Sequence, residues 1–195
     1  MSTFNVNQTT SSGSVFQKEV TVLDTVPGNV NPVAGVSVQV IPSGFFYTLI
    51  FTLASVSLVM TKNGTTSAGG GVLLYTFRKG LVLPFGGATN LTVVSLADAS
   101  YLASVGSAAA DTSGTLTTTE ISYLPSTAAT TSSLAGTCKM KSTVTTPTPG
   151  TPLDGTSTPN PLYLNSCLNA DGTGKETLVY SGTITVCVAH LGDNG

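Results

Sequence analysis

The sixteen residues 177–192 alternate between apolar side chains and small or hydroxyl side chains. Ile184, Val186 and Val188 are spaced two apart, and the positions between them and beside them are Thr183, Thr185, Cys187 and Ala189. Residues two apart on an extended chain share a face, so this stretch is predicted to be a β-strand with one apolar face. β-Branched residues favour the same structure. Because a strand needs partners, the rest of the chain must supply other strands.

Short apolar runs separated by turn-forming residues recur along the chain. The expected strands cover residues 15–26, 36–40, 45–54, 56–61, 72–77, 81–85, 91–96 and 161–170. Asn-Gly at 63–64 and Pro-Gly-Asn at 27–29 are turn signals. Runs and turns at this spacing are typical of an all-β sandwich or barrel.

Two hairpins are predicted from neighbouring runs. Residues 72–77 would pair with 81–85 across the Arg-Lys-Gly sequence at 78–80, and residues 161–170 would pair with 176–190. In the second hairpin Cys167 would lie opposite about residue 178. A disulfide between Cys167 and Cys187 is therefore disfavoured, and the cysteines, Cys138 included, are expected to be free thiols.

The least polar stretch, residues 45–60, raises the question of a membrane span. It has sixteen residues without a charge, whereas a spanning helix needs about 20. Its β-branched and aromatic content favours buried strands. No membrane partner is expected, and the polar start of the chain does not suggest a secretory signal.

Charged residues make up only 8% of the chain, against about 25% in ordinary soluble domains. The polar surface must be built from hydroxyls, because the chain has 33 threonines. Such a surface resists association poorly, which favours a protein covered by neighbours in an assembly over a free extracellular one. The net charge is −2 and there is no basic cluster, so nucleic acid is not an expected partner.

The residues that could carry chemistry form no recognisable motif. His190 is the single histidine, and Cys187, three positions away on a strand, would point to the opposite face. The nine carboxylates are scattered, and the Asp-Gly-Thr sequences at 154 and 171 lack the further ligands of a calcium loop. Thr117 and Glu120 have the spacing of a helix capping box. We expect a non-enzymatic protein without metal or cofactor.

Two segments of the chain, residues 1–14 and residues 142–161, are predicted to be irregular. Residues 1–14 are polar apart from Phe4 and Val6, and form either a disordered tail or an extended arm that docks these two side chains on a neighbour. Residues 15–195 would form one domain with a Pro-rich irregular loop at 142–161. Pro149 and Pro152 in this loop are, with Phe4 and Val6, the candidate interface residues.

The second half of the sequence resembles a family of tailed-bacteriophage virion proteins, of the capsid decoration or cement type. The resembling segments are 104–110 (SVGSAAA), 116–121 (LTTTEI), 124–128 (LPSTA), 154–158 (DGTST), 162–165 (LYLN), 181–185 (SGTIT) and 191–193 (LGD). They span about 90 residues. The Pro-rich stretch and the three cysteines depart from the family pattern, and no catalytic motif is available to carry over.

The resemblance implies a structural protein that decorates and stabilises the outer surface of a capsid and is made in the host cytoplasm. The expected fold is an antiparallel β-sandwich, jelly-roll-like, with an extended N-terminal arm and long Thr/Pro-rich loops. The expected partners are the major capsid protein and copies of the chain itself, as a homotrimer. The alternatives are a phage tail or head-fibre component, or a surface adhesion or carbohydrate-binding module; the absence of Trp counts against the last.

Overall fold

The computed structural model describes residues 3–9, 15–21, 27–63, 67–94, 101–128, 130–131, 137–144, 152–168 and 176–191. Most of these residues lie in strands, as predicted. The strands are β1 (Thr3–Thr9), β2 (Val15–Thr21), β3 (Gly28–Val30), β4 (Val36–Ser43), β5 (Phe46–Asn63), β6 (Ser67–Phe77), β7 (Leu81–Val94), β8 (Tyr101–Gly106), β9 (Leu124–Ala128), β10 (Thr130–Thr131), β11 (Thr137–Val144), β12 (Leu153–Asp154), β13 (Pro161–Leu168) and β14 (Glu176–Leu191). In this part of the chain the one helical element is a 3₁₀ turn, η1 (Thr118–Ile121).

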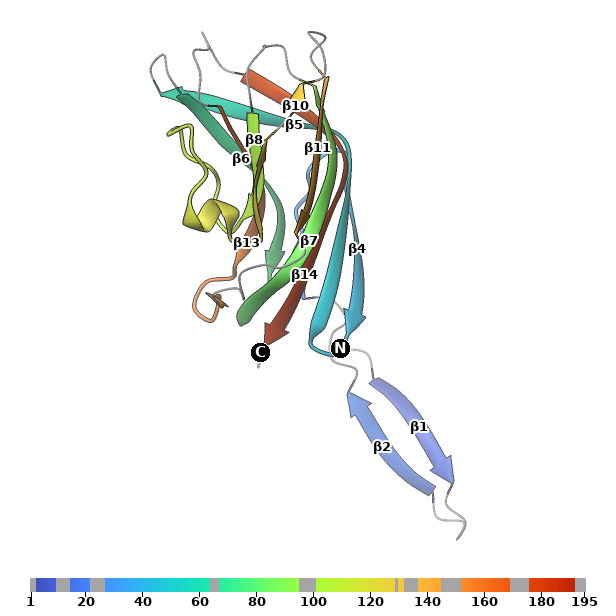
Figure 1. Ribbon diagram of the computed structural model, residues 1–195. Coiled ribbons are helices and arrows are strands. Elements are labelled where there is room, and N and C mark those ends of the chain that lie inside the picture. The colour runs from blue at the N-terminus through green and yellow to red at the C-terminus, as the bar shows by residue number, and fades with distance from the viewer. Residues whose placement is uncertain are drawn as a thin grey trace.

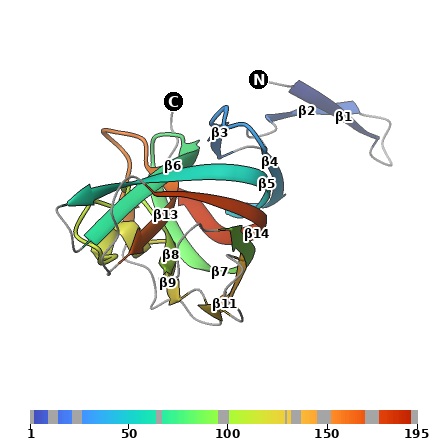
Figure 2. The ribbon, with the colours of Figure 1, turned by 90° about the horizontal axis from the view of Figure 1, so that it is seen from above.

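The strands from β3 onward form a continuous antiparallel sheet that folds over on itself (Figure 1). One half, sheet I, has the order β4-β5-β14-β7-β11, with β10 beside β11 and β12 beside the start of β7. The other half, sheet II, has the order β6-β13-β8-β9, with β3 on the free side of β6. Seen from above, the sheet curls round until β9 contacts β11 (Figure 2).

The strand order is that of a jelly roll. The eight main strands along the chain are β5, β6, β7, β8, β9, β11, β13 and β14. They divide into β5-β14-β7-β11 in sheet I and β6-β13-β8-β9 in sheet II, so that every connection except β8 to β9 crosses between the sheets. This is the double-sheet arrangement of two Greek keys. The predicted all-β, antiparallel, jelly-roll-like sandwich is confirmed.

The longest strand, β5, takes part in both sheets. It pairs with β14 along sheet I, and its end at 61–63 pairs with β6. The expected break between residues 54 and 56 is present as an irregularity within one strand. Ser55 has a φ of 57°, and the register with β14 shifts at Tyr180/Gly182. An extra residue on one strand bends it, and here it lets β5 curve from one sheet toward the other.

The core lies between the two sheets. On β14 the apolar positions Ile184, Val186 and Val188 are fully buried, as their alternation predicted. Their counterparts on the other strands are Leu49, Phe51, Leu58, Leu74, Phe77, Val82, Val93, Val105, Leu162 and Leu164. Alternate residues of each strand point inward, which is why the period of two in the sequence identified the core.

Both predicted hairpins are wrong. β6 and β7 lie in different sheets, and so do β13 and β14. Residue Cys167 of β13 faces Gly69 of β6 and Leu102 of β8, and is not opposite residue 178. In a jelly roll a short loop can carry the chain across the sandwich as well as back along the same sheet. Sequence periodicity identifies strands but does not choose between these two paths.

Two segments of the predicted domain layout take part in strand pairing. Residues 15–21, expected in the sandwich domain, form β2, which pairs with β1 in a separate two-stranded sheet. Parts of the loop expected at 142–161 lie in strands. β11 continues to Val144, and Leu153–Asp154 form β12 against β7.

Candidate functional site: an uncharged sheet face

Four adjacent strands of sheet I contain no Asp, Glu, Lys or Arg. They are β4, β7, residues 46–61 of β5 and residues 177–191 of β14. The inward residues of these strands fill the core, so their outward residues form a broad surface of Thr, Ser, Gln and apolar side chains. Natural sheets use charge, above all Lys, to keep exposed strands from associating. This face lacks that protection.

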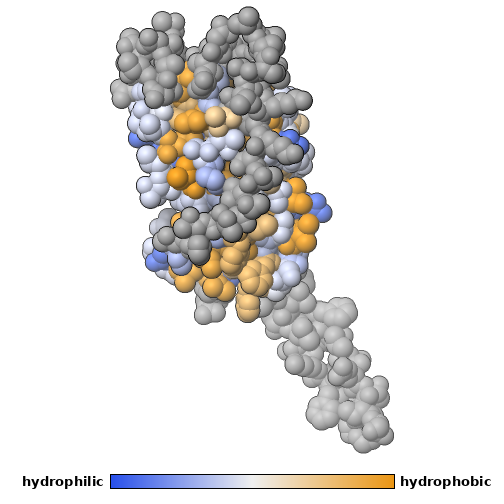
Figure 3. Space-filling view, viewed as in Figure 1, coloured by the Kyte–Doolittle hydropathy of each residue, from blue (hydrophilic) through white to orange (hydrophobic). Residues whose placement is uncertain are grey.

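Large apolar side chains gather at one end of this face. We call Phe45, Phe46, Leu81, Phe85 and Leu191 the phenylalanine patch. Figure 3 shows hydrophobic side chains gathered over the ends of β7 and β14. All five residues are exposed, and Phe45, in the turn between β4 and β5, is exposed to 62%.

The register of three strands builds the phenylalanine patch. Ala189 of β14 pairs with Phe46 of β5 on one side and with Leu83 of β7 on the other. The rings of Phe46 and Phe85 therefore meet across β14, with centroids 5.3 Å apart and planes at 56°. Ala189 is left only 3% exposed.

The strand ends complete the patch. Leu191 pairs directly with Leu81, and the backbone N–H of His190 donates to the carbonyl oxygen of Phe45 at 3.0 Å. These pairings place the five residues on one contiguous surface.

The opposite end of the same face carries smaller apolar side chains. Val59 of β5 and Val94 of β7 are exposed to 43% and 45%. Each lies next to β14, where Val59 pairs with Thr177 and Val94 pairs with Val179. The face thus has an aromatic end and a valine end, with hydroxyl side chains between them.

His190 has the environment of a structural residue. Its Nε2 lies 3.1 Å from the carbonyl oxygen of Arg78 and donates to it, and its ring stacks on Phe77 with centroids 6.3 Å apart. Cys187 points to the other side of β14, as predicted. Its Sγ lies 3.8 Å from Thr48 Oγ1. Cys167 and Cys187 are free thiols, and burial raises the pKa of the Cys167 thiol to about 11.

The carboxylates of Asp111 and Asp154 bind backbone groups. Asp111 accepts from the N–H of Ser113 at 2.7 Å, and Asp154 accepts from the N–H of Thr156 at 3.0 Å. Hydrogen bonds from these two hydroxyl residues hold the pKa of each aspartate below its usual value. Within the described part of the chain, no three His, Cys, Asp or Glu side chains are grouped to hold a metal.

The loop between β8 and β9 is fastened to the outer side of sheet II. Glu120 Oε2 accepts from the N–H of Thr117 at 2.7 Å, as the predicted capping box requires, and its Oε1 accepts from the N–H of Asp111 at 2.9 Å. Asn165, fully buried on β13, binds the backbone of Ala108, Ala110 and Glu120. These contacts make the loop a fixed part of the fold.

Glycines make room for this loop. A Cβ on Gly71 would meet the side chain of Asn165, one on Gly69 would meet the carbonyl of Asp111, and one on Gly106 would meet the backbone of Glu120. Gly69 to Gly71 therefore belong to β6, where the loop backbone passes close to the strand.

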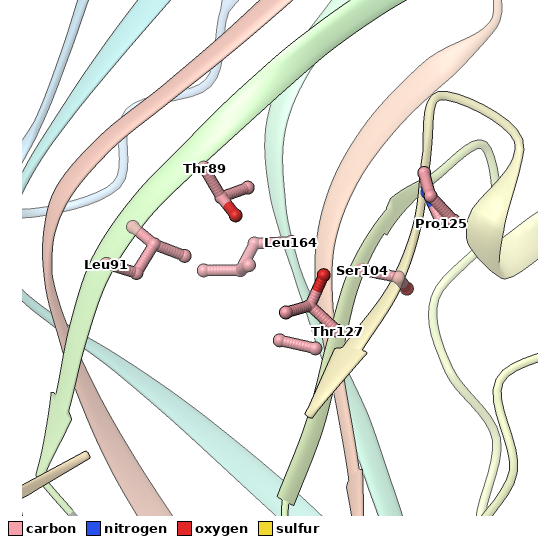
Figure 4. Close-up of a pocket in the computed structure, with 7 residues that line it drawn as sticks. Thr89, Leu91, Ser104, Pro125, Thr127 and Leu164 are labelled. Carbon is pink, nitrogen blue, oxygen red and sulfur yellow. The ribbon is translucent and has the colours of Figure 1, made fainter. Parts of the chain in front are cut away.

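A small cavity lies between the two sheets near β9. Thr89 and Leu91 of β7 line one side, Leu164 lies between, and Ser104, Pro125 and Thr127 line the other side (Figure 4). Its volume is about 10 Å³. That is room for about one water molecule, so the cavity is too small to bind an organic ligand.

The structure leaves the four predicted interface residues, Phe4, Val6, Pro149 and Pro152, as a prediction. Phe4 and Val6 belong to β1, whose backbone alone is described. Pro149 also lies outside the described residues, while Pro152 is exposed next to β12. The sequence interpretation missed the phenylalanine patch. The available signal was the run of residues 81–85, in which alternation turns Val82 and Pro84 inward and leaves Leu81 and Phe85 outward.

No protein-family model, curated protein or solved structure matches this chain. The resemblance to phage virion proteins therefore stays an expectation. Among the described residues, no helix has the length and apolar character needed to cross a membrane.

Proposed function

We propose that this chain is a non-enzymatic structural protein of a tailed-bacteriophage virion, which decorates the outer surface of the capsid and stabilises it. The observation that carries the proposal is the outer face of β4, β5, β14 and β7, which has no charged residue in 46–61 of β5, in 177–191 of β14 or in β4 and β7, together with its phenylalanine patch. Exposed apolar patches of this size on a single chain mark sites that another molecule covers. A protein held in a virion lattice meets that condition throughout its working life.

The mechanism is the burial of surface between subunits. A stable interface removes about 800 Å² per partner from water, and a decoration protein that contacts several capsid subunits at once ties them together. The partners are the major capsid protein and copies of the chain itself, as a homotrimer. The protein would be made in the host cytoplasm and located on the outer capsid surface.

The environments of the reactive residues support a structural role. His190 is held between a carbonyl and an aromatic ring, and the carboxylates of Asp111, Glu120 and Asp154 bind backbone N–H groups. Each of these side chains is engaged in maintaining the fold, and the described cavity is too small for a substrate.

Cryo-electron microscopy of virions from the phage that encodes this chain tests the proposal. We expect added density on the outside of the capsid that fits the jelly roll, and its loss in a phage from which the gene is deleted. The deletion phage should also release its DNA at a lower temperature. Density at the tail alone would instead identify a tail component. Absence from virions together with glycan binding by the isolated chain would identify an adhesion module.

A further inference from the structure

The cavity near β9 lies beside an irregularity in the strand pairing. Between the pairs Ala103–Thr127 and Val105–Leu124, β8 advances by two residues and β9 by three. β9 therefore carries a β-bulge, which leaves its extra residue outside the ladder of hydrogen bonds. Pro125 lies within this bulge, as suits a residue that has no N–H to donate to a ladder. Pro125 and Thr127 both line the cavity, so the cavity borders the bulge.

Two hydroxyl side chains from different sheets face this cavity. Thr89 lies on β7 in sheet I and is only 9% exposed, while Thr127 lies on β9 in sheet II and is half-buried. Figure 4 shows both hydroxyl oxygens pointing into the space around Leu164. The next inward positions of β7, Leu91 and Val93, are apolar. Thr89 thus places a hydroxyl where core packing alone favours valine, and burial of a hydroxyl is unfavourable unless it is hydrogen-bonded.

Backbone pairing does not join β9 to sheet I in the described part of the chain. β9 is the last strand of sheet II, and it pairs with β8. The contact between β9 and β7 is therefore made by side chains. A group that binds both Thr89 and Thr127 would connect the two sheets at this end of the sandwich.

We infer that the cavity is a binding site for one water molecule, which bridges Thr89 and Thr127. Its volume of about 10 Å³ suits a single water, and two polar side chains face it. A hydroxyl both donates and accepts, so each threonine can bind the water in addition to a protein partner. Water also donates and accepts, so one molecule satisfies both hydroxyls at once.

The third hydroxyl at the cavity belongs to Ser104. It donates to the carbonyl oxygen of Glu120 at 2.6 Å, so its proton is used by the loop between β8 and β9. Its oxygen can still accept a hydrogen bond. The bridging water then has partners on β7, β8 and β9, which is the number typical of buried waters that belong to a fold. This role is independent of where the protein acts.

A high-resolution crystal structure of the full chain tests the inference directly. We expect one water in the cavity, at about 2.5–3.0 Å from both Thr89 Oγ1 and Thr127 Oγ1. An empty cavity would overturn the inference. So would a water that contacts only one of the two hydroxyls.

The variants T89V, T127V and T89V/T127V test the same bridge in solution. Valine keeps the shape of threonine but cannot bind water. Each single variant leaves the water and the remaining hydroxyl without one partner, so its urea midpoint should fall. The midpoint of the double variant should fall by less than the sum of the two single shifts, because the shared partner is lost only once. A cooperative unfolding transition verifies that each variant is folded.

T52V is the matched control for this cycle. Thr52 is exposed on the outer side of β5, away from the cavity. The shifts of T52V and T127V should therefore add in the double variant T52V/T127V. Additive shifts for T89V and T127V as well would overturn the shared water.

Discussion

The side-chain amide of Asn165 donates from Nδ2 to the backbone carbonyl oxygen of Glu120 at 3.0 Å. The two residues are 45 positions apart, and the bond joins β13 to the 3₁₀ turn of the β8–β9 loop. Glu120 in turn binds the loop backbone through both carboxylate oxygens. A buried amide and a buried carboxylate thus hold an irregular segment against a regular sheet.

Replacement of Asn165 by Leu should destabilise the protein by about 3 kcal/mol. The substitution keeps the side-chain size but leaves the N–H of Ala110 and the carbonyl of Ala108 buried without their partner. Urea denaturation measures the loss, and hydrogen exchange should be fastest in the loop. The control is N160A, which removes a partly buried hydrogen bond from the Asn160 side-chain amide to the carbonyl oxygen of Leu153. It should cost about 1 kcal/mol. Equal losses would contradict this role for Asn165.

Ser55 should be replaceable by glycine with a gain in stability. Its φ of 57° lies in the left-handed region, which costs an L-residue about 1 kcal/mol that glycine does not lose. The N–H of residue 55 would still donate to Ser181 Oγ, at 3.0 Å in the wild type. S57G, at an exposed position of the same strand, should lose about 0.5–1 kcal/mol. Thermal unfolding of both variants measures the change in stability. A change of the same sign in S55G and S57G would contradict backbone strain at Ser55.

Two buried tyrosines should respond oppositely to the loss of the hydroxyl. The Tyr123 hydroxyl is buried without a hydrogen-bond partner in the described structure, and burial raises its pKa. Tyr180 donates to Ser166 Oγ at 3.0 Å. Y123F should therefore be neutral or stabilising, whereas Y180F should cost about 1–2 kcal/mol. Chemical denaturation under identical conditions compares them, and a larger loss for Y123F would show that its hydroxyl has a partner.

The thiols of Cys167 and Cys187 should label at different rates. Cys187 is half-buried, while Cys167 is fully buried and has a pKa of about 11. Since the thiolate is the reactive form, a disulfide reagent near neutral pH should modify Cys187 first and reach Cys167 only as the protein unfolds. Labelling at increasing pH should accelerate at Cys167 toward pH 11. Mass spectrometry of the labelled peptides measures both rates, and equal rates in the native protein would contradict the burial of Cys167.

Acid should weaken the fold partly through Asp111 and Asp154. Both carboxylates have a folded-state pKa below the usual value, because Ser113 and Thr156 donate to them. Their contribution is complete above the unfolded pKa and is lost as the pH falls through the folded pKa. The double variant D111N/D154N, whose amides do not titrate, should lose less stability between about pH 6 and about pH 2. If the free energy of unfolding fell equally with pH in the wild type and in the variant, this contribution would be ruled out.

Several features of the fold were predictable because they depend on local spacing. The alternation of Ile184, Val186 and Val188 predicted a strand and its buried face, and both are confirmed. The spacing of Thr117 and Glu120 indicated a capping box, which is present at the start of the 3₁₀ turn η1. In each case the deciding interactions lie within a few residues along the chain, so the sequence alone contains them.

The candidate surface was not predictable in the same way. Phe46 and Phe85 are 39 positions apart, and they meet only because β14 lies between β5 and β7. The predicted hairpin of residues 161–170 with 176–190 would have placed β14 elsewhere. Outward side chains on different strands form a patch only after the strand order is set.

By itself, the sequence determined that this chain is an antiparallel all-β protein with few charges, and which residues of most strands face the core. The tertiary structure decided the partner of each strand, the crossing of the chain between the sheets at Arg78 to Gly80, and the gathering of five exposed apolar residues at one end of sheet I. The physical reason is that side-chain alternation follows from the geometry of one strand, whereas strand order follows from how two sheets pack around a common core.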